Sequence, residues 1–231
     1  MNKILSDKKV IFFDVGYTLD YPVSGDWMLT QRFTELAGDK LKRISDKEFA
    51  DGYNICLDHL LQKHKVTTTQ EECQCFADFY AELSARLELG LSMAEIESIA
   101  HDRTYNMGIY RPYPDAKAVV ERLSRSFKLG IISDTWPSIE PQLEMLGVNP
   151  YFSFRTYSFT FGVMKPDKTL YLDALSQCGC EAHETVFIDD SVRNLQGAAE
   201  LGITPILIAA NPTADVETDY CKIHSLTELL G

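Results

Sequence analysis

The chain of 231 residues is long enough for one good-sized domain or for a domain that carries a large insertion. Its 45% hydrophobic and 24% charged residues are ordinary for a globular protein, and its net charge of −12 argues against binding to nucleic acid or to an anionic membrane surface. The apolar stretches are too short to span a bilayer, and the run from Val10 to Phe13 is too short for a signal peptide, so we expect a cytoplasmic protein.

The first predicted element is a buried strand over residues 9–13, which read KVIFF and run directly into Asp14. Ligands of α/β sheets bind at the carboxyl ends of the strands, which is where this carboxylate lies. Two residues later, where a second carboxylate would complete an acid pair, the chain has Gly16. The sequence therefore raises the question of what Asp14 can do without that neighbour.

Residues 22–108 are predicted to be helical. Apolar residues recur there near i, i+3, i+4 and i+7 spacing, in segments such as DWMLTQRFTELAGDKL and FADFYAELSARLEL. Ser92 is followed three residues later by Glu95, which is the pattern of a capping box at the start of a helix. We expect about four helices in this stretch and no strand.

After RPYP at 111–114 the pattern changes to alternating strands and helices, which is typical of a parallel sheet with helices on both faces. We predict strands at 128–133, 152–158, 184–189 and 204–209, and helices at 115–126, 138–147, 166–179 and 191–202. The predicted fold class is α/β, a Rossmann-like, doubly wound parallel sheet. Because the first strand precedes the helical stretch, we expect a core domain of residues 1–21 and 109–231 and an inserted helical domain of residues 22–108.

Polar side chains follow three of the predicted strands where each strand ends. Asp14 follows the first, Ser133 and Asp134 close the strand at 128–133, and Asp189 and Asp190 close the strand at 184–189. A lysine, Lys165, lies in a loop just before a helix. The carboxyl ends of parallel strands meet at one edge of a sheet, so these groups are expected to converge there. Oxygen ligands of this kind suit Mg²⁺ together with a substrate phosphate.

Each of these residues has a simpler explanation when it is taken alone. Asp190 and Ser133 could cap the helices that follow them, and Lys165 could be a solvated loop lysine. The six cysteines lack the C-x2-C spacing of a zinc site and are interpreted as reduced structural thiols. The combination of two acids, a hydroxyl and a lysine from separate elements is harder to explain by chance.

Four segments in order resemble the motifs of the haloacid dehalogenase-like hydrolases, a family that consists mostly of phosphatases. The segment FFDVGYTL resembles the first motif, with Asp14 as the nucleophile and Thr18 matching, and GIISD at Ser133 resembles the second. The segment GVMKPD at Lys165 resembles the third, and FIDDSVRNLQGA, with Asp189, Asp190 and Asn194, resembles the fourth. The resemblance covers nearly the whole chain, and the helical insertion looks like the cap domain of the family.

The resemblance implies phosphoryl transfer through a phospho-aspartate formed on Asp14, with Mg²⁺ as cofactor and a small phosphorylated metabolite as substrate. It implies catalytic roles for Asp14, Ser133, Lys165 and Asp189. The substrate ligands would be Thr18, Ser133, Asp134, Lys165 and Asn194, and the metal ligands would be Asp14, the backbone carbonyl of Gly16, and Asp190.

Gly16 departs from the family pattern, because phosphatases of the family carry an acid there that protonates the leaving group. General acid–base catalysis is typically worth about 10²–10⁴-fold, so we expect a slow phosphatase or one restricted to esters with good leaving groups. Aryl and acyl phosphates need the acid least.

Two alternatives stay open at this stage. The dehalogenases of the family also lack the second acid, but they place tyrosine at the position of Gly16 and have a less acidic fourth motif, since they use no metal. A non-catalytic protein that binds phosphate or a metabolite is the other alternative, and Gly16 is its best support. Trp27 and Trp136 could line the mouth of a pocket, but ordinary packing is the more common role of such residues, and we leave both out of the site.

Overall fold

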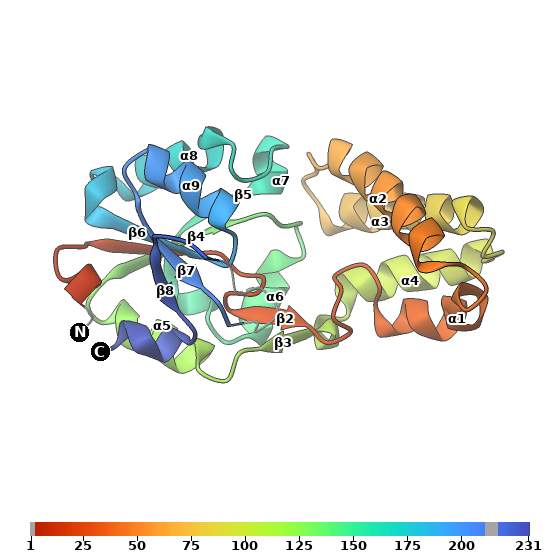
Figure 1. The fold of residues 1–231 in the computed structure, drawn as a ribbon, viewed down its shortest axis with the longest axis horizontal. Coiled ribbons are helices and arrows are strands. Elements are labelled where there is room, and N and C mark those ends of the chain that lie inside the picture. The colour runs from red at the N-terminus through yellow and green to blue at the C-terminus, as the bar shows by residue number, and fades with distance from the viewer. Residues whose placement is uncertain (1–2, 211–216) are drawn as a thin grey trace.

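A six-stranded parallel sheet forms the core of the computed structural model, which describes residues 3–210 and 217–231 (Figure 1). Strand β1 lies inside the sheet between β4 and β6, with Phe12 opposite Gly130 on one side and Phe187 on the other. The strand order across the sheet is β5 (Phe152–Tyr157), β4 (Lys128–Ser133), β1 (Val10–Phe13), β6 (Thr185–Asp189), β7 (Thr204–Ile208) and β8 (Cys221–Ile223).

Successive side chains of β1 enter two different apolar layers, because side chains of a strand alternate between the faces of a sheet. Ile11 and Phe13 pack in the layer covered by α5 (Ala116–Ser124) and α6 (Ile139–Met145). Val10 and Phe12 pack in the layer covered by α8 (Lys168–Cys178) and α9 (Val192–Glu200). The four residues of β1 are fully buried, so the strand that leads into Asp14 is held from both faces.

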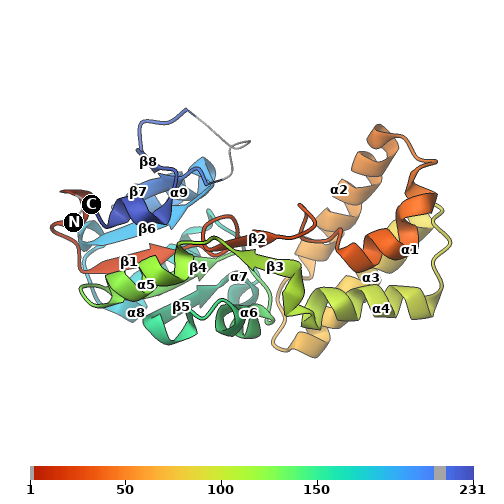
Figure 2. The same cartoon turned by 90° about the horizontal axis from the view of Figure 1, so that it is seen from below.

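Four helices between Pro22 and Tyr110 form a separate bundle to one side of the sheet (Figure 2). They are α1 (Gln31–Leu41), α2 (Asp46–Gln62), α3 (Thr69–Arg86) and α4 (Met93–Tyr105), and they bury their own cluster around Phe33, Phe76, Tyr80 and Leu83. Capping boxes begin α2, α3 and α4, including the predicted pair Ser92 and Glu95.

The chain enters and leaves this bundle along a two-stranded antiparallel ribbon, β2 (Asp20–Pro22) and β3 (Tyr110–Pro112). The other short elements are α7 (Ser158–Phe161) and the 3₁₀ helices Lys3–Leu5, Met107–Ile109, Asn149–Tyr151, Ala182–Glu184 and Leu226–Leu229. In the described ranges, no helix has the length and apolar character needed to cross a bilayer.

The predicted α/β class with a parallel, doubly wound sheet is confirmed. The sequence pattern missed the ribbon, α7 and β8, because strands and helices of three or four residues carry too few positions to show a period. The division into domains of residues 1–21 and 109–231 and of residues 22–108 stays a prediction.

Gly130 of β4 provides a test of the packing around β1. A Cβ atom at this position would lie 2.6 Å from Cδ1 of Phe12 and 3.1 Å from Cβ of Phe154, so Gly130→Ala overpacks the layer below α8. We expect the free energy of unfolding in urea to fall by about 1–3 kcal/mol.

The control is Gly38→Ala in α1, where the added Cβ would lie 3.6 Å from Thr34. There the helix preference for alanine should stabilise the protein by up to about 1 kcal/mol. Equal effects at the two positions would contradict this account.

Candidate active site

The carboxyl ends of β1, β4 and β6 bring the predicted polar residues to one rim of the sheet. These three strands are neighbours, so Asp14, Ser133 and Asp189 end adjacent strands. Asp134 and Asp190 follow Ser133 and Asp189 directly. The parallel topology alone therefore produces this cluster of oxygen-bearing side chains.

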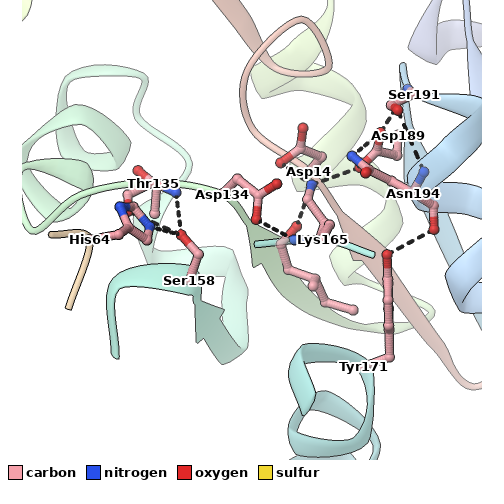
Figure 3. A network of polar contacts seen from close by, with 11 residues as sticks. Asp14, His64, Asp134, Thr135, Ser158, Lys165, Tyr171, Asp189, Ser191 and Asn194 are labelled. Carbon is pink, nitrogen blue, oxygen red and sulfur yellow. Dashed lines mark hydrogen bonds and ion pairs between the residues drawn. The ribbon is translucent and has the colours of Figure 1, made fainter. Parts of the chain in front are cut away.

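The ammonium group of Lys165 lies at the centre of the cluster (Figure 3). Its Nζ is 2.8 Å from Oδ1 of Asp14 and 2.7 Å from Oδ2 of Asp189, and it donates to the backbone carbonyl of Ile132 at 3.2 Å. The backbone N–H of Lys165 donates to Oδ1 of Asp134 at 2.8 Å. A lysine ammonium has three donors, and all three are used here to hold protein oxygen atoms.

Asp189 is held in place by the start of the following helix. Its Oδ1 accepts from the backbone N–H of Ser191 at 2.7 Å, and the side-chain amide of Asn194 donates to both of its oxygens at 3.2 Å. Asp189 is fully buried and bonds Lys165, so it serves to orient that lysine. Asn194 in turn orients Asp189, and no phosphate contact is needed to explain its position.

The cluster carries more negative than positive charge, and the pKa values reflect this excess. Burial, opposed by Lys165 and reinforced by Asp189 and Asp190, raises the pKa of Asp14 to about 8. Burial and Asp189 raise the pKa of Asp190 to about 6. Burial alone would lower the pKa of Lys165, but the surrounding carboxylates outweigh it and raise that pKa. One ammonium group therefore does not fully compensate the acids around it.

A divalent cation fits this donor set. Carboxylate oxygens of Asp14, Asp189 and Asp190 lie within 4.8 Å of one another, and an oxygen-only set is the type that Mg²⁺ prefers. Asp14 and Asp190 line the cavity above the rim, whereas the oxygens of Asp189 are occupied by Lys165, Ser191 and Asn194. The two acids that face the cavity, together with Gly16 beside them, are thus the residues that could hold a metal ion.

A cavity of about 280 Å³ lies between the rim of the sheet and the helical bundle. The core contributes Asp14, Gly16, Ser133, Asp134 and Asp190 to its lining. The rest of the lining is mostly aromatic and apolar, with a few polar groups: Val15, Tyr17, Trp27, Met28, Tyr53, Leu57, Leu60, Leu61, Arg103, Tyr110, Thr135, Trp136, Ser138, Ile139 and Gln142. The nucleophile candidate Asp14 therefore opens onto a small pocket with a polar floor and a largely apolar wall.

The ring of Trp27 lies against the backbone at Gly16. A Cβ atom built on Gly16 would approach Cζ2 of Trp27 to 2.9 Å, closer than carbon atoms normally come. The indole is packed in turn against Tyr17, with ring centroids 5.2 Å apart, and against Tyr110 at 6.0 Å. An acid at this position would therefore collide with the aromatic wall, so Gly16 and Trp27 form a matched pair.

Two buried hydrogen-bonded contacts join the bundle to the core beside the cavity. Glu72 of α3 accepts from the backbone N–H of Ser138 at 2.7 Å and from its hydroxyl at 2.5 Å. Nε2 of His64, just after α2, lies 2.6 Å from Oγ of Ser158, which also accepts from the backbone N–H of Thr135 (Figure 3). These contacts close the bundle over the rim.

The structure brings eight of the nine predicted site residues together: Asp14, Gly16, Ser133, Asp134, Lys165, Asp189, Asp190 and Asn194. Thr18 is the exception. It is fully buried, its hydroxyl has no hydrogen-bond partner among the described residues, and it borders a different hollow near Tyr113 and Leu226. Its predicted contact with substrate stays a prediction, and its surroundings favour a role inside the loop.

Sequence reasoning missed several residues that line the cavity. The predicted site leaves out Trp27 and Trp136, and no sequence pattern indicates Arg103, Ser138 or Gln142. The two tryptophans could have been found only from their positions, one just inside the helical stretch and one just after Ser133. Nothing in the sequence around Arg103 distinguishes it from a surface residue of an amphipathic helix.

Comparisons with known proteins give a family match for most of the chain. A family model described as haloacid dehalogenase-like hydrolase matches residues 27–208. The glyceraldehyde 3-phosphate phosphatase of Methanocaldococcus jannaschii is 32% identical over 130 residues, which cover 54% of this chain and 57% of that protein. The chain thus spans about half the length of the curated relatives that it matches.

Solved structures share the fold over nearly the whole chain. The 2-haloacid dehalogenase from Pseudomonas syringae pv. Tomato DC3000 superimposes with a TM-score of 0.64 and 20% identity, covering 96% of each chain. YfnB from Bacillus subtilis, solved with magnesium bound, gives a TM-score of 0.64 and 18% identity, again over 96% of each chain. At this level of identity the likeness shows the fold alone.

The excess negative charge predicts that Asp190→Asn stabilises the metal-free protein. A carboxyl group whose pKa is raised on folding holds its proton more tightly in the native state, so stability falls as pH rises from about 4 to about 6. In EDTA, the free energy of unfolding of the variant should therefore equal that of the wild type below pH 4. Above pH 6 it should exceed the wild-type value by about 1 kcal/mol, a figure that allows for screening by solvent in the cavity. Urea unfolding measured across pH checks this. Asp51→Asn, on the exposed face of α2, is the control, and a destabilised Asp190→Asn at pH 7 would refute the interpretation.

Proposed function

This chain belongs to the haloacid dehalogenase-like hydrolases, and on that basis we propose that it is a Mg²⁺-dependent phosphatase of a small phosphorylated metabolite. One observation carries the proposal. Asp14 lies on the floor of the cavity with one oxygen bound to Lys165, and the carboxylate of Asp190 lines the same floor. A phosphatase needs both a carboxylate nucleophile and a site for a cation beside it, and the haloacid chemistry of the family needs no such cation site.

In the proposed reaction, the oxygen of Asp14 that does not bond Lys165 attacks phosphorus. A bond forms between this oxygen and phosphorus as the bond from phosphorus to the leaving alcohol oxygen breaks, which gives a phospho-aspartate. Water then attacks phosphorus, releases inorganic phosphate and restores the carboxylate. Lys165 orients Asp14 and favours its charged form, because the ion pair between them opposes the burial that raises the pKa of this carboxyl group.

The metal ion would be held by the carboxylates of Asp14 and Asp190 and by the backbone carbonyl of Gly16. When bound, it would supply positive charge to the phosphate oxygens and offset the excess of carboxylates. Asp189 holds the ammonium group of Lys165 in position by accepting its hydrogen bond. Ser133, which lines the cavity, would donate its hydroxyl to a phosphate oxygen.

The leaving group would depart without an acid at position 16. The hydroxyl of Tyr53, which lines the cavity, donates to Asp26 at 3.1 Å, and burial together with that carboxylate raises its pKa. This hydroxyl is therefore a poor source of a proton at neutral pH. We expect the enzyme to favour aryl and acyl phosphates, whose leaving groups need no proton.

The function is tested by phosphate release from p-nitrophenyl phosphate, acetyl phosphate and glycerol 3-phosphate, with Mg²⁺ and with EDTA. We expect turnover that requires Mg²⁺, is fastest on the first two esters, and falls by at least about 10³-fold in Asp14→Asn, which lacks the nucleophile. Chloride release from 2-chloropropionate is measured in parallel. Chloride without phosphate would support dehalogenation instead, and Mg²⁺-dependent phosphate binding without turnover would support a binding protein.

The Gly16 and Trp27 pair predicts how an acid could be restored. Gly16→Asp alone should not raise turnover, since the new side chain meets the indole 2.9 Å away. In a Trp27→Ala background, Gly16→Asp should raise kcat/KM for glycerol 3-phosphate about tenfold more than for p-nitrophenyl phosphate, because the poorer leaving group gains more from a proton donor. The matched comparison is Trp27→Ala with Gly16 retained. An equal gain on both esters would show that the acid is not what this position lacks.

A further inference from the structure

The helical bundle places one charged side chain in the lining of the cavity above Asp14. This side chain is Arg103 of α4, which is 6% exposed. Among the described residues that line the cavity, no other carries a positive charge, and both of the acids that could hold a metal follow strands of the core, whereas Arg103 belongs to the helical bundle. The proposed mechanism gives this arginine no role.

The immediate surroundings of Arg103 hold no direct counter-ion. Its Nη1 donates to the hydroxyl of Tyr110 at 2.8 Å, and its guanidinium group lies over the rings of Phe76 and Tyr110, 4.8 and 5.8 Å from their centres. Its Nε has no partner, and no carboxylate oxygen lies within 4.0 Å in residues 3–210 and 217–231. A buried cation is costly to maintain without a matching anion, so its retention here needs a reason.

Two buried acids act on Arg103 from a greater distance. Glu72 uses both of its oxygens to accept from Ser138. Oδ2 of Asp20 accepts from Gln142 at 2.7 Å, whereas its Oδ1 has no hydrogen-bond partner among the described residues. Both acids interact with Arg103 only through the longer-range electrostatic field, so neither forms an ion pair with the guanidinium group.

We propose that Arg103 binds a carboxylate on the leaving-group side of the substrate, which is therefore the phosphate ester of a small hydroxy acid. This inference rests on the proposed phosphatase function. A guanidinium group matches a carboxylate in shape and charge and can donate to both of its oxygens. A phosphate group in place of this carboxylate would bring two negative charges to the single cation, so the carboxylate is the better match in charge. The aromatic and apolar groups between the two ends of the cavity suit a short carbon chain.

The test measures binding, so that it does not depend on turnover. Isothermal titration at pH 7.5 with Mg²⁺ compares 3-phosphonopropionate with propylphosphonate, which have the same phosphonate and chain length but carry carboxylate and methyl ends. A third ligand, propane-1,3-bisphosphonate, carries a second phosphonate. We expect the wild type to bind 3-phosphonopropionate at least about tenfold more tightly than either of the others.

Variants assign the preference to the arginine. Arg103→Met should abolish the preference for the carboxylate, and Arg103→Lys, which keeps the charge and loses the planar fork, should retain part of it. Arg86→Met, on the outer face of α3 and paired with Glu82, should leave the preference intact. If Arg103→Met does not fold, the wild-type ratio and Arg103→Lys still decide the question.

The outcomes separate this inference from the function on which it rests. Equal binding of the three ligands, or tightest binding of the bisphosphonate, overturns the carboxylate assignment even where p-nitrophenyl phosphate is hydrolysed. Absence of phosphonate binding together with absence of phosphate release overturns both proposals. A preference for the carboxylate that survives in Arg103→Met places its recognition elsewhere in the cavity and also refutes the inference.

Discussion

The ion pairs of Lys165 with Asp14 and Asp189 are the constraint on which the site depends. Four carboxylates meet at one rim because three parallel strands end there, and burial together with their mutual repulsion favours protonation of Asp14. A single buried ammonium group offsets part of this repulsion, and it uses its third donor to fix itself to the backbone of β4. The remaining excess of negative charge is what suits the rim to a cation, so the raised pKa of Asp14 and the fit of a cation have one origin.

The packing around Gly16 shows how the site differs from one that carries an acid at this position. The space that such a side chain would take is filled by the indole of Trp27, which is itself held by Tyr17 and Tyr110. The absence of the acid is therefore accommodated in the wall of the pocket by the packing of Gly16, Trp27, Tyr17 and Tyr110. Tyr17, whose φ is 55°, is in the left-handed region, so the loop also accepts backbone strain to present this arrangement.

Sequence patterns were enough to predict the sheet and the groups along its rim, because strand ends in a parallel sheet are placed by topology alone. The apolar run into Asp14 and the acids after β6 each identify themselves locally. Thr18 does not line the cavity because the turn after Val15 folds back, with the N–H groups of Thr18, Leu19 and Asp20 all donating to the Val15 carbonyl. Trp27 and Arg103 could not be found in this way, since their places in the cavity depend on how a bundle that begins many residues away packs against the core.

The ribbon of β2 and β3 is the place where the chain enters and leaves the helical segment. Pro22 and Tyr110 face each other across a strand pair, so the two ends of the whole intervening segment lie about 5 Å apart. The backbone of the core therefore joins the segment as it would join the loop of one hairpin, and the buried contacts of Glu72 and His64 are added to that connection. Such a joint lets a lineage exchange the helical segment while the register of β1, β4 and β6 stays the same, and it lets an engineer transplant a foreign module onto this core at the same two residues.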